Sequence, residues 1–552
     1  MFAGKSIDHR ATEKNKKSFS DNMKKIRTSR VVYLVLLSIF FAALPARMPA
    51  QQERRSESQA PARTLEELKA RISEILAKPE LEPAMVGVKV VSLETGRVLF
   101  EENAHKLLRP ASNMKLYTVA AALDRLTPDY RFVTSVYASS SPDAGGVIRG
   151  NLTIYGRGDP SIAARFNNGD YFKAIDELAA RIVAAGVKRV EGDLVGDETY
   201  FYGPQYGSGW NWEDLTWYYG AEITPLTVND NALDLFVKPG PAVGRPALIT
   251  TGPPDPLLTI VNQVITSPKG VARELSIHRG LGENKITVTG SIPVDDRGYS
   301  GAIGISHPGL LLVYLLRSSL AQKGVVITGK SRTTGALTHP PFNLVPMTPG
   351  TNGSSGSAPN EIASLQSPPF SLIAAQTLKP SQNLYTELIL RTLGQMTSPL
   401  SDLTGPFQTS ENLGLEAVKS FLKSAGITPE SLVLDDGSGL SRNDMITADA
   451  SVQLLTFMSK HRYADVFREA LPIAGVDGTL RNRMRGTPAQ NNVRAKTGSL
   501  SSAASLAGYV TTAAGEKLAF SITVNNYPRG FDPRSACIDP IAVQLAAYAG
   551  KP

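Results

Sequence analysis

Hydrophobic and polar residues follow helix and strand periods in turn along the first 130 residues after the N-terminal region. Thr64-Leu65-Glu66-Glu67 has the form of a capping box and predicts a helix to about Ala77. Two strand patterns follow, Val86 to Leu93 and Arg97 to Phe100. The apolar run from Pro110 to Leu123 then predicts a largely buried helix.

Short strand patterns with many glycines and prolines dominate residues 135–335. They are Val147 to Tyr155, Leu233 to Val237, Leu275 to His278 and Lys285 to Val288. Two helical patterns interrupt them, at Tyr171 to Ala185 and Leu310 to Lys323. This part of the chain is therefore predicted to form one or two mostly β units inserted into the first domain.

After residue 361 the pattern becomes helical again and ends in a hairpin and a helix. The predicted helices are Ser371 to Lys379, Leu384 to Leu393, Leu413 to Ala425 and Ala448 to Lys460. The hairpin joins Ser505 to Thr511 with Lys517 to Asn525, and the last helix is Asp539 to Tyr548. Strands at both ends with helices between them predict an α+β fold, in which helices flank one antiparallel sheet.

The N-terminal region has the features of a secretory signal. Lysines and arginines precede the apolar run Val31 to Leu44, which has the length of a signal-peptide core and is short for a membrane span. Met23 is the expected translation start, and cleavage is expected near Ala46 or Ala50. An uncleaved membrane anchor is the alternative, and both place the folded part outside the cytoplasm.

Composition and charge limit the partners and the cysteine and histidine chemistry that can be expected. The net charge of +8 owes much to residues 1–30, so it gives little support for a nucleic-acid partner. Cys537 is the only cysteine, which excludes an internal disulfide and predicts a free, partly buried thiol. The six histidines show no metal-ligand spacing, and His105 near Ser112 carries little weight as a catalytic base.

Ser112 and Lys115 stand three residues apart at the start of the predicted helix. Positions i and i+3 are neighbours on one helix face, so the hydroxyl and the amine are expected to meet in the first turn. An amine whose pKa is lowered by burial can take the proton of a serine, which makes Ser112 a candidate acyl-transfer nucleophile. The spacing alone is weak evidence, because Ser420 and Lys423 share it.

Two further motifs carry suitable chemistry. Ser381-Gln382-Asn383 follows a predicted helix, where a hydroxyl and an amide two residues apart can face one cleft. Lys496-Thr497-Gly498 occurs once, where a strand is expected to begin. Its lysine and threonine offer a cation and a donor to a carboxylate, and its glycine allows a bound substrate backbone to come close.

Ser-x-x-Lys, Ser-x-Asn and Lys-Thr-Gly in this order resemble the signature of the penicillin-recognising serine acyl-transferases. Asp435 to Arg442 and Ala474 to Leu480 resemble landmarks of one subfamily, the D-alanyl-D-alanine carboxypeptidase/endopeptidases or class C low-molecular-mass penicillin-binding proteins. The resemblance covers about residues 64 to 549. It implies a transpeptidase-like domain with mostly β inserted domains.

The chain is too long for one ordinary core, so several units are expected. They are a basic region and signal peptide (1–50), a transpeptidase-like domain in two parts (62–134 and 361–552), an inserted domain in two parts (135–238 and 303–337), a nested second insert (239–302) and a linker (338–360).

The resemblance also implies roles for individual residues. Ser112 would attack the carbonyl between two D-alanines of a peptidoglycan stem peptide, with Lys115 as general base. Ser381 would shuttle protons and Asn383 would hold the substrate amide. The terminal carboxylate would bind Lys496 and Thr497. The remaining expected substrate contacts are Gly498, Asp159 and the oxyanion hole, which the backbone N–H groups of Ser112 and Ser499 would form. The resemblance also implies that no metal and no organic cofactor are needed.

Several motifs keep two interpretations. Asp159, in Gly158-Asp159-Pro160, could meet an amine of the stem peptide or be an ordinary turn aspartate. The stretch Asp435 to Arg442 is favoured as structural. Trp210, Trp212 and Trp217 are favoured as a packed loop between domains over a glycan-stacking surface.

Stem peptides and β-lactam antibiotics are the expected partners, and peripheral membrane association and the oligomeric state stay open. A β-lactamase or esterase on the same fold is the strongest rival enzyme. A catalytically dead wall-binding relative is the rival from another class. The long insert argues against the first, and the intact set of motif residues argues against the second.

Overall fold

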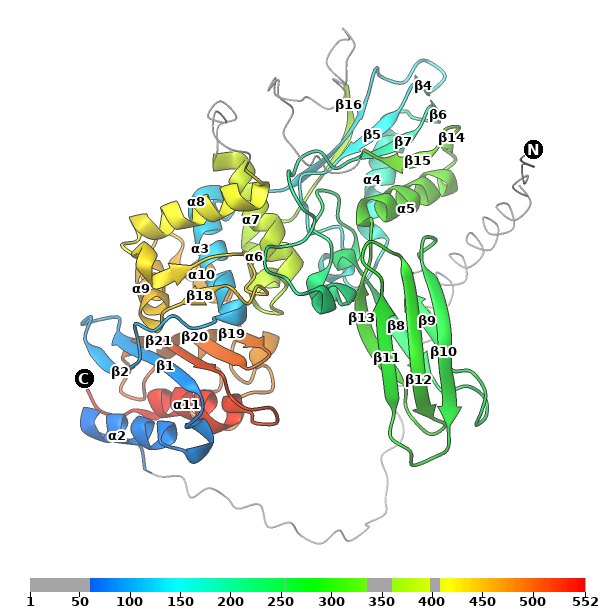
Figure 1. Cartoon of the computed structure of the whole chain (residues 1–552). Helices are drawn as coiled ribbons and strands as arrows, with labels where there is room; N and C mark the ends of the chain where they lie inside the picture. The colour runs from blue at the N-terminus through cyan, green and yellow to red at the C-terminus, as the bar shows by residue number, and fades with distance from the viewer. Residues whose placement is uncertain (1–59, 254, 335–359, 398–407, 552) are drawn as a thin grey trace, which may run out of the picture. The chain divides into compact units, whose positions relative to one another are not determined.

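The structure is a computed structural model that describes residues 60–253, 255–334, 360–397 and 408–551 (Figure 1). The predicted signal peptide, the expected start at Met23 and the predicted linker up to residue 359 lie outside the described residues.

One five-stranded antiparallel sheet unites the two ends of the described chain. Its order is β19 (Arg494–Leu500), β20 (Ala503–Thr511), β21 (Lys517–Asn525), β1 (Met85–Ser92) and β2 (Val98–Glu102). Strand β1 pairs with β21 so that Met85 lies opposite Asn525 and Ser92 opposite Leu518. The sheet predicted from the terminal strand patterns is therefore confirmed. Lys496 lies within β19 and not at its first residue.

Helices cover both faces of this sheet (Figure 1). On one face, α2 (Leu65–Leu76) and α11 (Asp539–Ala547) share a core with Val88 and Val90 of β1. The capping box at the start of α2 is present, because Thr64 Oγ1 accepts the Glu67 N–H and Glu67 accepts the Thr64 N–H. On the other face lies α9 (Ala448–Ser459), whose Asp449 pairs with Lys89 of β1 at 2.9 Å.

A helix bundle surrounds α3 (Met114–Leu126), which is buried on nearly every side because its sequence is apolar all round. Its other members are α6 (Phe370–Leu378), α7 (Asn383–Thr397), α8 (Ser410–Ser424) and α10 (Ala464–Glu469). The predicted helices in this part of the chain are present, with boundaries that differ by a few residues. A two-stranded ribbon, β17 (Leu432–Val433) and β18 (Met445–Ile446), borders the bundle.

The described residues between 133 and 366 form four further sheets and two α-helices, and they are mostly β as predicted. The sheet orders are β15-β7-β5-β3-β16, β14-β6-β4, β13-β8-β9 and β10-β12-β11. The helices are α4 (Lys173–Ala184) and α5 (Pro308–Gln322). The strand bounds in chain order are β3 (Val133–Ala138), β4 (Val147–Arg149), β5 (Leu152–Tyr155), β6 (Arg189–Glu191), β7 (Leu194–Asp197), β8 (Ala232–Lys238), β9 (Leu248–Gly252), β10 (Thr259–Ser267), β11 (Glu274–Arg279), β12 (Lys285–Pro293), β13 (Tyr299–Gly304), β14 (Val326–Ile327), β15 (Ser331–Thr333) and β16 (Asn360–Gln366).

Two details differ from the predicted strands. The run Val147 to Tyr155 forms two strands in different sheets, because Gly150 has a φ of 122° and bends the chain between them. Strand β16 lies where a return to helices was expected. It pairs with β3, and its half-buried residues lack a clear alternation of apolar and polar positions.

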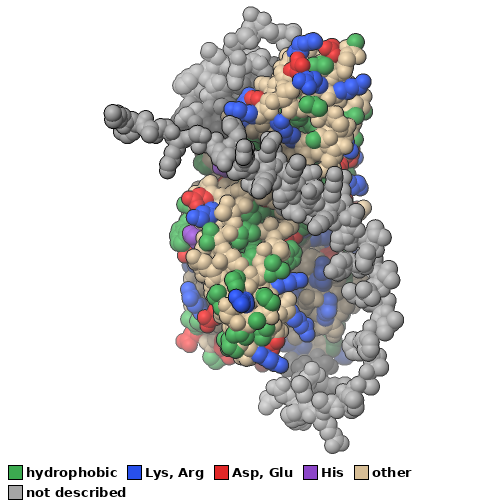
Figure 2. Space-filling view, turned by 90° about the vertical axis from the view of Figure 1, so that its right-hand side faces the viewer, with side chains coloured by type: hydrophobic (Ala, Val, Ile, Leu, Met, Phe, Trp, Pro, Cys, Tyr) green, Lys and Arg blue, Asp and Glu red, His purple; other side chains and the backbone are tan. Residues whose placement is uncertain are grey.

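Apolar side chains reach the surface on the strands of residues 232–304, among them Leu248 (58% exposed) and Ile265 (46% exposed). Figure 2 shows a face on which hydrophobic side chains lie among lysines and arginines. Across the described residues, every helix is too short or too polar to serve as a transmembrane span. The residue boundaries proposed for the inserted domains stay predictions.

Candidate active site

Ser112 lies in a single 3-10 turn, Ala111–Asn113, that leads directly into α3. Lys115 is in the first turn of α3, and its Nζ lies 3.0 Å from Ser112 Oγ. The predicted meeting of hydroxyl and amine is therefore confirmed. Ala111 has a φ of 48°, so the residue before the serine adopts a backbone conformation that costs energy without a glycine.

Lys115 is fully buried and held from three directions. Its Nζ donates to Asn383 Oδ1 and to the Ser438 carbonyl, both at 2.6 Å. Burial lowers the pKa of Lys115 to about 8, although the carboxylates of Asp436, Glu387 and Asp444 act in the opposite direction. When the amine is neutral, its two hydrogens satisfy these two acceptors. The lone pair then faces the Ser112 hydroxyl.

Ser381 and Asn383 lie at the entrance of α7. Ser381 has a φ of 66°, and its Oγ accepts a hydrogen bond from Lys496 Nζ at 2.8 Å. Asn383 begins the helix, and its Nδ2 donates to the Tyr219 carbonyl at 2.8 Å. That contact turns the amide oxygen toward Lys115.

Lys496 and Thr497 connect β19 to the same cluster. Lys496 is fully buried, and burial together with the charge of Lys115 holds its pKa well below the usual range. Thr497 Oγ1 lies 2.8 Å from the hydroxyl of Thr479. Thr479 belongs to the stretch Ala474 to Leu480, which the sequence identified only as a landmark.

Gly498 brings the sheet close to the nucleophile. A Cβ at this position would lie 2.2 Å from Ser505 Oγ and 2.4 Å from the Pro110 carbonyl oxygen. The glycine therefore allows β19 to pack against the residues that precede Ser112. This is a different reason for a glycine than the close approach of a substrate backbone that the sequence suggested.

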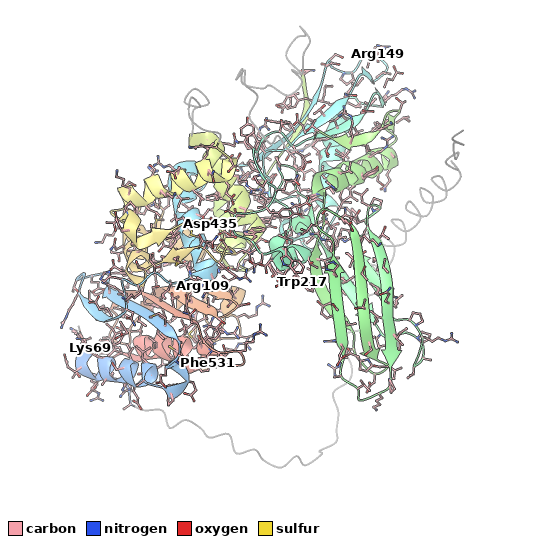
Figure 3. The ribbon with its side chains drawn as sticks, in the orientation of Figure 1. Lys69, Arg109, Arg149, Trp217, Asp435 and Phe531 are labelled. Carbon is pink, nitrogen blue, oxygen red and sulfur yellow. The ribbon has the colours of Figure 1, made fainter. Side chains whose placement is uncertain are left out.

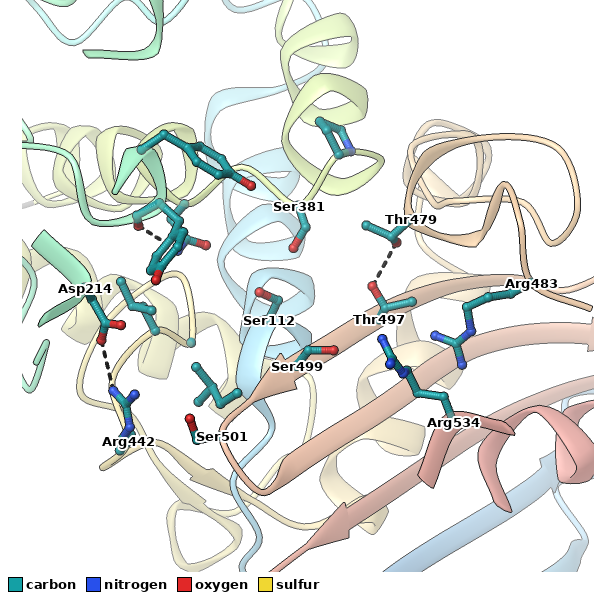
Figure 4. Close-up of a pocket in the computed structure, with 17 residues that line it drawn as sticks. Ser112, Asp214, Ser381, Arg442, Thr479, Arg483, Thr497, Ser499, Ser501 and Arg534 are labelled. Atoms are coloured by element: carbon teal, nitrogen blue, oxygen red, sulfur yellow. Dashed lines mark hydrogen bonds and ion pairs between the residues drawn. The ribbon is translucent and has the colours of Figure 1, made fainter. Parts of the chain in front are cut away.

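These residues border a cleft of about 510 Å³, a size typical of ligand sites. Ser112 lies near its centre between Ser381 and Ser499, as Figure 4 shows. Asn383, Thr479 and Thr497 also line it. The two lysines lie behind this lining, so the cleft presents hydroxyls to a ligand and keeps the amines away from water.

The loop Asp435 to Arg442 holds the Ser438 carbonyl in place. The Asp436 carboxylate accepts the backbone N–H groups of Ser438, Gly439, Leu440 and Ser441 at 2.6–3.1 Å. Gly439 has a φ of 76°, and a Cβ there would lie 1.9 Å from the Ala111 carbonyl oxygen. The loop thus has the favoured structural role of positioning Lys115, and its Gly439, Leu440 and Arg442 also line the cleft. Figure 3 marks its first residue, Asp435, and Arg109 just before the nucleophile.

Residues 207–220 contact this loop and complete the cleft. Trp210 Nε1 donates to Asp436 Oδ2 at 2.8 Å, and Asp214 pairs with Arg442 at 3.0 Å at the cleft wall. Trp212 is 61% exposed. The packed-loop interpretation therefore fits Trp210 but not Trp212. Sequence reasoning missed Asp214, Tyr219 and Ser438, since no local pattern indicates which distant segment they will meet.

The structure does not bring Asp159 to the cleft. Its side chain is 1% exposed, and Oδ1 accepts the Ser161 N–H in a local turn. Burial raises the pKa of Asp159 to about 6. His105 has an exposed side chain beside Asp449 and also lies outside the cleft lining. Among the described residues, no group of histidine, cysteine or acidic side chains is arranged to hold a metal ion.

The fold and the site fit a class, the serine-type D-Ala-D-Ala carboxypeptidases. The crystal structure of penicillin binding protein 4 (dacB) from Haemophilus influenzae is similar with a TM-score of 0.71, at 24% identity over 86% of this chain and 98% of that one. The chain belongs to the D-Ala-D-Ala carboxypeptidase 3 (S13) family, whose profile matches residues 68–548.

Individual relatives support this assignment. A D-alanyl-D-alanine carboxypeptidase of Actinomadura sp. (strain R39) is 36% identical over 497 residues, which is 88% of this chain and 86% of that protein. The D-alanyl-D-alanine carboxypeptidase DacB of Haemophilus influenzae is 27% identical over 460 residues, or 81% of this chain and 87% of that protein.

Proposed function

We propose that this protein is a serine D-Ala-D-Ala carboxypeptidase and endopeptidase of peptidoglycan stem peptides, and that penicillin acylates it on Ser112. Membership of the S13 family supports the reaction class. The observation that carries the proposal is the position of the buried Lys115 amine, 3.0 Å from Ser112 Oγ and anchored by two oxygen acceptors.

Acylation uses Lys115 as the base. The neutral amine takes the Ser112 proton while Oγ attacks the carbonyl carbon between the two D-alanines. The backbone N–H groups of Ser112 and Ser499 stabilise the oxyanion, and losing one such donor typically slows a reaction by about a hundredfold or more. Ser381, hydrogen-bonded to Lys496, relays the proton that Lys115 took up to the leaving amine as the C–N bond breaks, which leaves Lys115 neutral again. Water then hydrolyses the ester.

Binding is assigned to the remaining motif residues. Thr497 and Lys496 hold the terminal carboxylate, with the Thr479 hydroxyl beside Thr497. Asn383 contacts the substrate amide through its side chain, and Gly498 and Ser499 place the β19 edge alongside the peptide. No metal or organic cofactor is assigned to these steps.

The family acts on cell-wall substrates, which places this activity outside the cytoplasm. A periplasmic enzyme exported by a cleaved signal peptide is the proposed form. Support comes from the basic residues before the apolar run Val31 to Leu44.

Mass spectrometry after brief incubation with benzylpenicillin tests the proposal. A long-lived adduct on the peptide that contains Ser112 is expected, and Ser112→Ala should abolish it. Ser420→Ala is a matched control, because Ser420 and Lys423 share the spacing but are exposed on α8. That variant should be labelled like the wild type.

Two other outcomes would replace the proposal. Fast turnover of the drug without an adduct would indicate a β-lactamase. Neither labelling nor turnover would indicate a protein that binds the wall without catalysis.

A further inference from the structure

The cleft continues past Thr497 to two arginines that the reaction described above does not use. Arg483 follows the 3-10 turn Gly478–Leu480, and Arg534 begins the helical turn Arg534–Ile538 before α11. Both line the cleft, and Figure 4 shows their guanidinium groups directed to the same region beside Thr497.

Both guanidinium groups keep N–H donors available for a ligand. Arg483 uses Nε and Nη2 on Asp539, at 2.5–3.2 Å, and Arg534 uses Nε on Asp532 at 2.7 Å. Nη1 of Arg483 and both terminal nitrogens of Arg534 have no hydrogen-bond partner among the described residues. The Arg534 side chain is 51% exposed and that of Arg483 is 17% exposed.

The two ends of the cleft differ in the charge they present. At one end Arg442 pairs with Asp214, and both residues line the cleft, so a ligand meets both signs. At the Thr497 end the arginines line the cleft while Asp532 and Asp539 do not. A ligand at this end therefore meets the cationic side of each pair, which favours a carboxylate.

We propose that Arg483 and Arg534 form a leaving-group subsite for the second stem peptide of a cross-link. This inference rests on the proposed function. When D-alanine is the leaving group, it carries one carboxylate, which Thr497 and Lys496 hold beside the Thr479 hydroxyl. In a cross-link the leaving amine belongs to a second stem peptide, which carries carboxylates of its own. The two arginines lie beyond Thr497 along the cleft, and they bind one of these carboxylates of the second stem peptide.

This subsite selects cross-linked peptides over monomers. A guanidinium that reaches a carboxylate makes charge-assisted hydrogen bonds, and each such bond is worth roughly tenfold in affinity or more. The ratio of kcat/KM for a cross-linked dimer to kcat/KM for a monomeric pentapeptide should therefore fall about tenfold in Arg534→Gln. Arg534→Lys should retain part of the ratio, because it keeps the charge but not the fork of donors.

The experiment compares D-alanine release from a pentapeptide muropeptide with cleavage of a purified cross-linked dimer. Arg534 is the residue to change first, since its ion pair with Asp532 is exposed and contributes little to stability. Arg529→Gln is the matched control, because Arg529 is exposed nearby and does not line the cleft. A dimer whose second stem has amidated carboxylates tests the role of charge directly. The wild-type enzyme should cleave this dimer with a lower kcat/KM than the dimer with free carboxylates.

Two results would overturn the subsite. One is an unchanged ratio in Arg534→Gln, which includes an equal loss on both substrates, and the other is an amidated dimer that is cleaved as well as the free acid. Each of them leaves the proposed function intact, because that function is judged by the penicillin adduct on Ser112. Absence of the adduct would instead reject the function itself.

Discussion

Two buried lysines at the active centre have side-chain pKa values below the ordinary lysine range. Lys115 and Lys496 have no exposed surface, and burial lowers the pKa of each side chain. The positive charge of Lys115 lowers the pKa of Lys496 further. Each amine touches a serine hydroxyl, Ser112 or Ser381. The site thus combines two amines that are buried away from bulk water with two serine hydroxyls that line the cleft.

The pH dependence of acylation follows from the pKa of Lys115, about 8. Only the neutral amine accepts the Ser112 proton. The acylation rate is therefore expected to be low below pH 7 and to rise about tenfold per unit until it levels off above pH 8. Stopped-flow measurement with a chromogenic penicillin across pH 6 to 10 checks this.

Lys423→Met serves as the control for that profile, since Lys423 is exposed and belongs to the second Ser-x-x-Lys sequence. It should show the wild-type curve. A midpoint near 10.5, the usual lysine value, would rule out a Lys115 base with a lowered pKa.

Among the elements, the loop Asp435 to Arg442 and the start of α3 depend on one another. The loop supplies the Ser438 carbonyl to Lys115 and crosses the helix start at Gly439. The buried carboxylate of Asp436 accepts hydrogen bonds from four backbone N–H groups of this loop. Because charge-assisted bonds to a fixed carboxylate rigidify a turn, the carbonyl is held in position for the lysine.

Gly439→Ala should disrupt this crossing. The new Cβ would lie 1.9 Å from the Ala111 carbonyl oxygen, and φ is already 76°. Loop or helix must move, so we expect acylation by penicillin to fall at least a hundredfold and the unfolding temperature to drop. Labelling rate and thermal unfolding are the measurements.

The control for this change is Gly426→Ala. Gly426 has a φ of 80° with no atom within 4 Å of the new Cβ, so it carries the backbone strain of about 1–2 kcal/mol without a clash. Its labelling rate should stay near the wild-type value. Similar losses in both variants would show that strain alone, and not the crossing, limits the site.

For the whole molecule, segments far apart in the sequence complete one site. Tyr219 orients Asn383, and Trp210 donates to Asp436. The residues around 207–220 therefore support catalytic residues that belong to α7 and to the 435–442 loop. Removing these contacts should slow the acylation of Ser112, although none of the contacts involves Ser112 itself.

Trp210→Phe tests this coupling. The change keeps an aromatic ring and removes the indole donor to Asp436, a hydrogen bond to a charged group worth about 1.5–3 kcal/mol. Acylation should slow roughly ten- to 150-fold if all of that energy holds the loop in place. Trp212→Phe is the matched change, because Trp212 is 61% exposed, and it should react like the wild type. Equal acylation rates in the wild type and in both variants would show that residues 207–220 do not support catalysis.

Local patterns predicted the elements well where apolar periodicity was strong. The helix from Pro110 to Leu123 and the hairpin of β20 and β21 are examples, because each pattern follows one period over many residues. Strand β16 was missed because its partner β3 lies more than 200 residues earlier and supplies the hydrogen bonds that make it a strand. Propensity is a weak guide where pairing is that distant.

The sequence by itself determined the motif residues, their order and the contact of Ser112 with Lys115. A spacing of three positions within one helical turn sets the distance between those two side chains. Only the tertiary structure decided which groups surround the amine. The Ser438 carbonyl, Tyr219 and the arginines beside Thr497 reach the cleft through long-range packing. It also kept Asp159 out of the cleft, since the side chain is buried in a local turn in which Oδ1 accepts the Ser161 N–H. Contacts within one turn follow from covalent geometry, whereas contacts between distant segments follow from how whole elements pack.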